Sequence, residues 1–150
     1  MAVNRLRNHS IVILDANALF LPFKFNINLD SELTRLFGKY EIIIPSCVLS
    51  ELRGLRNSEK FGISALKLAL SKAQPKWYKD FEAELIENLN SRGIRIGNDF
   101  QVDLQILEIA KALYGFVVTN DKNLLKKLRA NDIRTISLRS KKYLKPNYQL

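Results

Sequence analysis

Two aspartates each follow a short, strongly apolar run of the sequence. Asp15 comes directly after residues 11–14, and Asp121 comes soon after residues 115–118. Such runs are typical of strands that are buried on both faces, and the carboxyl ends of parallel strands line the crevice where α/β proteins bind ligands. Both aspartates are therefore expected at a functional edge. The alternative is structural: Asp15 caps the next turn or helix, and Asp121 complements the dipole of the helix that follows.

Two further acids lie on segments with helical periodicity. Between residues 46 and about 57, Glu51 lies at the border of the apolar face, where an ordinary surface glutamate is the alternative to a functional one. Between about 100 and 114, Asp103 falls inside the apolar sector. A buried carboxylate is costly unless it pairs with a cation or binds a metal. The pattern shows no basic partner on a core face, which favours the metal for Asp103.

If the sheet is parallel, these four acids converge on one edge. Clustered carboxylates repel one another unless divalent cations neutralise them. Cations held in this way can activate water and stabilise the charge of an in-line displacement at phosphorus. The single cysteine, Cys47, and the single histidine, His9, exclude a Cys/His zinc site and an internal disulfide. Any metal must be bound mainly by oxygen, which suits Mg²⁺ or Mn²⁺.

Positive charge is concentrated in the last third of the chain. The formal net charge is +9, and residues 122–145 contribute +8 of it, with nine basic residues against Asp132. A basic segment beside carboxylates indicates a polyanionic substrate, whereas the alternative is a solvated helix face. The candidates for contacts with such a substrate are Lys122, Lys126, Lys127, Arg129, Lys141 and Lys142.

Short apolar runs alternate with helical patterns along the chain. Strands are expected near residues 11–15, 41–44, 115–118 and 133–138, with a further short strand at 94–96. Helices are expected near residues 31–37, 46–57, 59–72, 77–89, 100–114 and after 121. This order predicts one α/β domain over residues 1–150, with a central parallel sheet of about five strands flanked by helices.

Several local signals set the expected boundaries. Pro22 and two asparagines predict a loop over residues 21–28, and residues 139–150 are expected to form a basic tail. The residues expected to cap helices are Asp30 or Ser31, Ser46, Asp99, and Thr119 or Asn120. No run has the length of a membrane span, and residues 1–10 lack the apolar stretch of a secretory signal. We therefore expect a globular cytoplasmic protein with no membrane partner.

Four segments, by their order and spacing, resemble a PIN-domain nuclease over nearly the whole chain. They are Ile-Leu-Asp-Ala-Asn at 13–17, Pro-Ser-Cys-Val-Leu-Ser-Glu-Leu at 45–52, Val-Asp-Leu-Gln-Ile-Leu-Glu-Ile-Ala at 102–110 and Val-Val-Thr-Asn-Asp at 117–121. The resemblance implies dependence on Mg²⁺ or Mn²⁺ and endonucleolytic cleavage of RNA. It places the family's catalytic, metal-binding acids on Asp15, Glu51, Asp103 and Asp121. Its small polar positions, with supporting roles, fall on Asn17 and Thr119.

The Leu-Pro-Phe stretch and the segment Leu-Arg-Ser-Lys-Lys-Tyr-Leu further resemble small single-domain archaeal PIN proteins. Some of these are similar to a nuclease of ribosomal RNA processing, and others are VapC-type toxins. The resemblance therefore implies RNA, a second copy of the chain, and an antitoxin or ribosome-assembly factor as partners. Many relatives carry a second aspartate after the third acid, where this chain has Leu104, which weakens a second metal site. Three functions stay open: a metal-dependent endoribonuclease, a catalytically weak RNA-binding or assembly protein, and a toxin.

Overall fold

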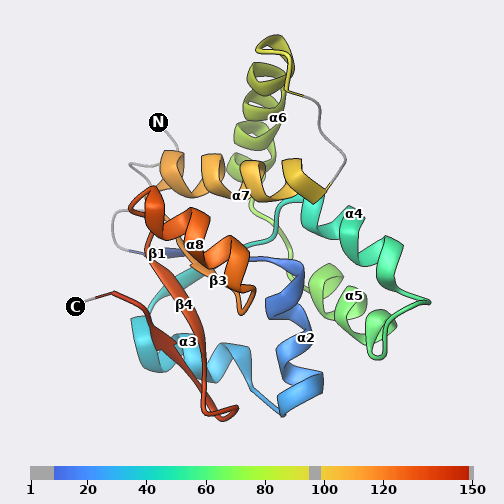
Figure 1. Cartoon of the computed structure of the whole chain (residues 1–150), viewed down its shortest axis with the longest axis vertical. Coiled ribbons are helices and arrows are strands. Elements are labelled where there is room, and N and C mark those ends of the chain that lie inside the picture. Colours follow the sequence, from blue (N-terminus) through green and yellow to red (C-terminus); the bar gives the residue numbers. More distant parts are fainter. Residues whose placement is uncertain (1–8, 95–98, 149–150) are drawn as a thin grey trace.

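The computed structural model describes residues 9–94 and 99–148, in which five strands form one sheet (Figure 1). The strands are β1 (Ser10–Leu14), β2 (Tyr40–Ile43), β3 (Phe116–Val118), β4 (Thr135–Arg139) and β5 (Tyr143–Pro146). Their order across the sheet is β2-β1-β3-β4-β5. The first four run parallel, and β5 pairs antiparallel with β4. The expected α/β sheet is confirmed, with an antiparallel strand at one edge.

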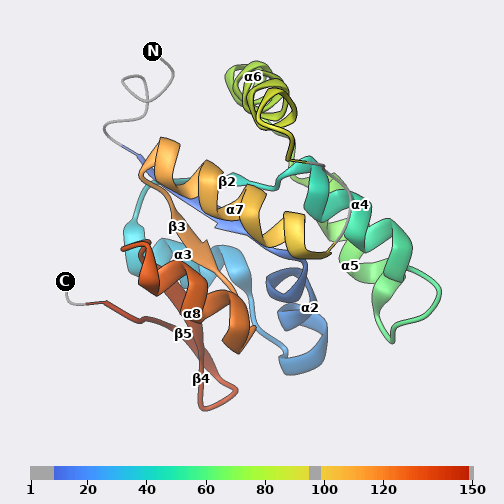
Figure 2. The same ribbon diagram turned by 45° about the horizontal axis from the view of Figure 1, so that its top comes forward.

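Helices flank the sheet (Figure 2). They are α2 (Ala16–Phe25), α3 (Leu29–Phe37), α4 (Ser46–Leu55), α5 (Gly62–Ser71), α6 (Lys76–Ser91), α7 (Asp99–Leu113) and α8 (Lys122–Ala130). The core is built around β1, where Val12, Ile13 and Leu14 have no exposed surface. α7 packs on β1 and α8 packs on β4. None of the helices in the described residues has the length and apolar composition that a membrane crossing requires.

The loop expected over residues 21–28 is wrong, because α2 continues through Pro22 to Phe25. A proline inside a helix removes one backbone donor. Here Phe20 and Leu21 bury their side chains in the core just before it, and this packing outweighs the local cost. The helix ends at Asn26, whose φ of 56° is the left-handed conformation that asparagine tolerates.

Three helix caps differ from those expected. Asn28, rather than Asp30 or Ser31, caps α3, and its Oδ1 accepts the Ser31 N–H at 3.0 Å. Pro45 occupies the N-cap position of α4, so Ser46 is the first helical residue instead of the cap. α8 is capped by Asp121 instead of Thr119 or Asn120. The cap expected at Asp99 and the strand expected at 94–96 fall on or beside residues outside those described, and Ile94 itself lies in no strand.

The segment expected as a basic tail contains β5. Leu144 is fully buried, while Tyr143 and Lys145 on either side of it are exposed, as strand alternation requires. Lysines on an edge strand are compatible with a sheet because their side chains remain in water. The turn of residues 140–142 between β4 and β5 carries Lys141 and Lys142, both exposed.

The parallel strands determine where the polar residues meet. Leu14 pairs with Val118, so Asp15 after β1 stands beside Thr119 after β3. α8 begins at this same edge, and α7, which leads back to β3, begins there as well. The carboxyl edge of the sheet therefore gathers the ends of two strands and the first turns of several helices.

Candidate active-site cleft

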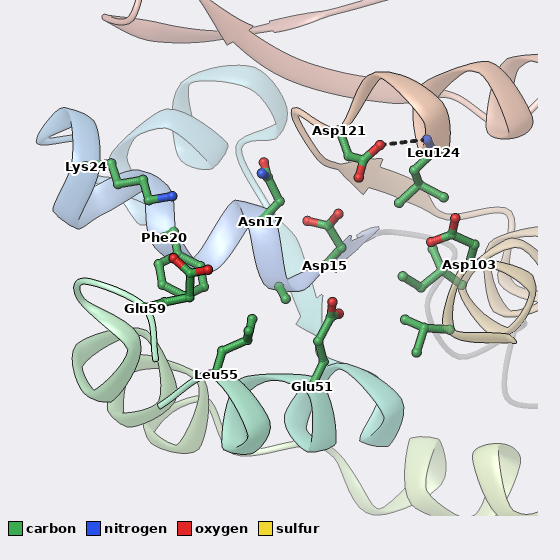
Figure 3. Close-up of a pocket in the computed structure, with 13 residues that line it drawn as sticks. Asp15, Asn17, Phe20, Lys24, Glu51, Leu55, Glu59, Asp103, Asp121 and Leu124 are labelled. Atoms are coloured by element: carbon green, nitrogen blue, oxygen red, sulfur yellow. Dashed lines mark hydrogen bonds between the residues drawn. The ribbon is translucent and has the colours of Figure 1, made fainter. Parts of the chain in front are cut away.

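A cleft of about 230 Å³ opens at the carboxyl edge of the sheet, and all four predicted acids line it (Figure 3). Asp15 lies at its centre, between Glu51 from α4 and Asp121 at the start of α8. Asp103, from the first turns of α7, lies on the wall beside Leu124. The structure therefore brings together four acids that are far apart in the sequence.

Asp15 is the most buried of these acids, with 6% of its surface exposed. Its Oδ1 accepts the Ala18 N–H at 2.8 Å and so caps α2, and its Oδ2 accepts the Thr119 hydroxyl at 2.5 Å. Burial raises the pKa of Asp15 to about 7, with repulsion from Glu51 and Asp121 adding to the rise and the two hydrogen bonds opposing it. Asp15 is thus a helix cap, as the structural alternative holds, and it also lines the cleft, while its functional role stays a prediction.

Thr119 connects two of the acids. Its buried hydroxyl donates to Asp15 and accepts the backbone N–H of Asp121 at 3.1 Å. Asp121 in turn accepts the N–H groups of Asn123 and Leu124 at 2.9 and 3.1 Å through one oxygen, Oδ1. The Thr119 and Asp121 side chains are therefore held by backbone groups at the start of α8.

Asn17 links the segment after β1 to the turn after β3. Its Oδ1 accepts the backbone N–H of Asn120 at 3.0 Å, which joins α2 to the turn after β3. The side chain also lines the cleft. Both predicted supporting residues thus contact the backbone or the acids of this edge.

Asp103 does have a basic partner, contrary to the expectation. Lys127 Nζ lies 3.0 Å from Asp103 Oδ2, and the Asp103 side chain is about one quarter exposed. The partner comes from α8, so the apolar pattern of α7 could not show it. Lys127 is therefore engaged with an acid of the cleft. Lys122, Lys126 and Arg129 are exposed elsewhere on α8.

Three lining residues were missed by the sequence interpretation. Phe20 and Lys24 line the cleft from α2, with the Lys24 ammonium 5.0 Å from the centre of the Phe20 ring. Together with Asn17 they have the spacing of one helix face, a signal that the expected loop at 21–28 concealed. Glu59 lines the cleft from the turn between α4 and α5. That turn is tight, because a Cβ on Gly62 would lie 2.5 Å from the Leu55 carbonyl oxygen.

The donor set of the cleft suits a hard divalent cation. Its acids offer carboxylate oxygens, the ligands that such cations prefer. The raised pKa of Asp15 shows that the negative charge of this carboxylate is unfavourable when no cation is bound. In residues 9–94 and 99–148, however, no three Asp, Glu, His or Cys side chains stand close enough together to hold an ion as they lie. Enclosing an ion therefore requires these side chains to move closer.

Comparison with known proteins identifies the family. The family model described as a PIN like domain matches residues 12–141. The chain is 34% identical over 140 residues to ribonuclease VapC4 of Methanocaldococcus jannaschii. The aligned region covers 88% of this chain and 92% of that protein. The PIN domain endonuclease Utp24 superposes with a TM-score of 0.63 at 20% identity, covering 97% of this chain and 96% of that one.

A chain of VapBC2 from Rickettsia felis, solved bound to a DNA fragment from its promoter, superposes with a TM-score of 0.52 at 24% identity. That match covers 86% of this chain and 99% of the other. At such identities the two solved structures show a shared fold. The family model and the archaeal relative go further, and this chain belongs to the PIN-like domain family.

Proposed function

We propose that this protein is a divalent-metal-dependent endoribonuclease whose active site is the cleft at the carboxyl edge of the sheet. The observation that carries the proposal is Asp15, a buried carboxylate beside Glu51 and Asp121 with its pKa raised to about 7. A protein keeps such a costly group where a cation or a reaction makes use of it. The 34% identity to a ribonuclease supports RNA as the substrate.

Asp15, Glu51, Asp103 and Asp121 are the proposed ligands of Mg²⁺ or Mn²⁺, because they supply only carboxylate oxygens. A bound ion of this kind lowers the pKa of a water molecule and offsets the charge that develops on a phosphate. The ammonium of Lys127, at 3.0 Å from Asp103, occupies one of these carboxylates in the structure described here. Ion binding therefore competes with Lys127 for Asp103.

The surrounding residues hold the proposed ligands in place. Thr119 and the Ala18 N–H engage both oxygens of Asp15, which limits its rotation. The two backbone N–H groups that Asp121 accepts do the same at the start of α8. Asp15 and Asp121 are thus oriented in advance, which lowers the free energy needed to reach the reactive geometry, although the acids must still move closer to enclose an ion.

Exposed cations stand on two sides of the cleft. Lys24 lines it from α2, and Lys122, Lys126 and Arg129 are exposed on α8. Lys141 and Lys142 lie in the turn that follows β4, at the same edge of the sheet. We propose that these residues bind the phosphates of an RNA strand that crosses the cleft.

The identity to VapC4 favours one biological setting for this activity. It supports a VapC-type toxin whose cleft is blocked by an antitoxin partner, and the solved VapBC2 structure has a chain of the same fold. A role in ribosome assembly has weaker support, because the similarity to Utp24 is one of fold at 20% identity. A homodimer is a further proposal that sedimentation would test.

The activity itself is tested with metal-free protein and a labelled single-stranded RNA. We expect no cleavage in chelator, and internal cuts once Mg²⁺ or Mn²⁺ is added, because the clustered acids need a cation to function. Gel analysis of RNA labelled at either end distinguishes internal cleavage from trimming. If a broad set of RNAs stays intact with either ion, the protein is instead the catalytically weak RNA-binding member of the alternatives.

The basic residues are tested by the salt dependence of RNA binding in chelator. Replacing Lys122, Lys126 and Arg129 together with alanine should reduce the slope of log affinity against log salt by about 2, because each phosphate contact on a single strand contributes about 0.7. The matched control replaces Lys67, Lys76 and Lys79, which are exposed on α5 and α6, and removes the same charge. Equal slopes for the two triple variants would mean that RNA does not follow α8.

A further inference from the structure

A second surface suited to RNA lies at the opposite edge of the sheet, where α7 and α8 end. The residues that follow the two helices line a shallow pocket of about 180 Å³. Its principal polar side chains belong to Lys111, Tyr114, Asn131, Asp132 and Arg134. This pocket shares no lining residue with the cleft.

Tyr114 stands out in this pocket because the residue is 75% exposed, the largest fraction among the exposed large hydrophobic residues of the described part of the chain. Its φ is 52°, in the left-handed region. Gly115 N–H donates to the Ala110 carbonyl at 3.0 Å, and Tyr114 N–H donates to the Lys111 carbonyl at 3.5 Å. These two bonds are the Schellman motif that closes a helix, and they place Tyr114 where glycine is usual.

α6 ends in the same motif, with glycine at the position that Tyr114 occupies after α7. There Gly93, with φ of 78°, donates to the Asn90 carbonyl, and Ile94 N–H donates to the Leu89 carbonyl. The Cβ of a tyrosine makes this left-handed conformation unfavourable. Burial of the side chain could offset that free energy, but the Tyr114 side chain is mostly exposed. Packing and backbone preference therefore do not account for an aromatic residue at position 114.

Two cations line the pocket together with Tyr114. The Arg134 guanidinium lies 3.9 Å from the centre of the Phe116 ring, and its Nη2 donates to the Tyr114 carbonyl at 2.7 Å, so the side chain is held beside Tyr114. Lys111 is exposed one helical turn before it. Asp132 is the acid among the described residues that line the pocket. An exposed aromatic ring beside two cations is the combination that binds unpaired nucleotides.

The pocket and the cleft lie at the two ends of the same pair of helices. α7 and α8 run side by side in both views (Figures 1 and 2), and the Asp103–Lys127 ion pair joins them. Both begin at the cleft and end at the pocket, and the rise along α7 from Asp103 to Tyr114 is about 16 Å. The exposed Lys126 and Arg129 of α8 lie between the two, so cations continue from one end to the other.

We propose that Tyr114 stacks on an unpaired base of a single-stranded RNA, at a distance from the cut phosphate, while Arg134 and Lys111 bind the adjoining phosphates. The inference rests on the proposed function, since it extends the path of the same RNA strand. Stacking accepts every base, so this site selects unpaired RNA and is tolerant of sequence. The RNA must also be long enough, because only a strand that reaches from the cleft to the pocket can stack on Tyr114.

The test measures binding by fluorescence anisotropy in chelator, where cleavage is prevented, with single-stranded RNAs of about 4 and about 12 nucleotides. Tyr114→Ala should weaken binding of the longer RNA about tenfold and leave the shorter one unchanged. Tyr114→Phe keeps the ring and should bind as the unchanged protein does. Leu70→Ala, at another exposed apolar side chain, is the control and should have no effect.

Tyr114→Asn separates binding from folding. Asparagine tolerates the left-handed conformation, so this variant should melt no lower than the unchanged protein while it loses the same affinity as Tyr114→Ala. In the unchanged protein, 5-iodouridine near the far end of the longer RNA should crosslink to the peptide that carries Tyr114. The crosslink should disappear in Tyr114→Asn.

The outcomes separate this inference from the proposed function. If Tyr114→Ala binds the longer RNA normally, while the variant lacking Lys122, Lys126 and Arg129 binds both RNAs more weakly, the stacking site is wrong and the ribonuclease proposal stands. Equal losses in Tyr114→Ala and Tyr114→Phe would also overturn the stacking site. If the unchanged protein binds neither RNA in chelator, the stacking site is wrong, and the ribonuclease proposal is decided by the cleavage assay with Mg²⁺ or Mn²⁺.

Discussion

Asp15→Asn is expected to lower the rate of RNA cleavage by at least about a hundredfold, the upper range for residues that only support a metal ligand. The asparagine can still accept the Ala18 N–H through its Oδ1, and asparagine is as good a helix cap as aspartate. Loss of activity without loss of the fold is therefore the predicted result. Cleavage assays in Mn²⁺ and circular dichroism measure the two properties. Asp80→Asn, at an exposed acid of α6, is the matched control.

The same substitution is expected to stabilise the metal-free protein above pH 7. The pKa of Asp15 rises from 3.8 to about 7 on folding, so the folded state binds its proton more tightly than the unfolded state does. The contribution of Asp15 to the free energy of unfolding is then highest below pH 4, falls as the pH rises toward 7, and is constant above it. At about 1.4 kcal/mol per pKa unit, the loss is on the order of 4 kcal/mol.

Urea denaturation in chelator at pH 5 and pH 8 tests this dependence on pH. The unchanged protein and Asp80→Asn should both be less stable at pH 8, whereas Asp15→Asn should show a much smaller difference. At pH 8 it should be the most stable of the three. An Asp15→Asn variant that is less stable than the unchanged protein at pH 8 would show that the charged carboxylate stabilises the fold.

Thr119→Val should combine lower activity with a shifted dependence on pH. Valine has a similar shape but cannot donate to Asp15 or accept the part-buried Asp121 N–H. The buried acceptor Asp15 Oδ2 then loses its donor, at a cost of about 1–3 kcal/mol. The Thr119 hydrogen bond lowers the pKa of Asp15, and its removal should raise that pKa further. We expect activity to fall about 10- to 100-fold and the rise of cleavage rate with pH to move to higher pH.

Thr119→Ser is the matched control, because serine keeps the hydroxyl and both hydrogen bonds. It should retain most of the activity and the original pH profile, at a small cost in packing. Cleavage rates measured across pH 5 to about 9 in Mn²⁺ compare the variants. If valine and serine have the same effect, the hydroxyl does not position Asp15, and the role of Thr119 is packing alone.

The parts of the site that depend on strand ends were predictable from the sequence. Apolar runs before Asp15 and Asp121 indicated buried parallel strands, and the carboxyl ends of such strands meet at one edge. The helical spacing predicted Glu51 at the border of an apolar face and Asp103 inside one, and both line the cleft at that edge. These predictions succeeded because each rests on a period within one element and on a general property of parallel sheets.

The remaining features depend on contacts between elements. The Asp103–Lys127 pair joins α7 to α8, and no pattern within α7 contains its partner. α2 passes through Pro22 because the buried side chains that precede the proline outweigh its local preference. β5 forms because β4 offers a free edge, where the buried Leu144 pairs with Leu138, and because β5 contacts α3. The lysines of this segment gave no sign of such a strand.

The central claim is that the four acids of the cleft hold a divalent cation, and a crystal of the protein soaked in Mn²⁺ tests it most directly. The anomalous difference map should show a peak in the cleft, in direct contact with a carboxylate oxygen of Asp15 and with at least one of Glu51, Asp103 and Asp121. Asp15→Asn crystals soaked in the same way should show a weaker peak or none. A peak that touches none of the four acids, in crystals of protein that cleaves RNA only with Mn²⁺, would contradict the account.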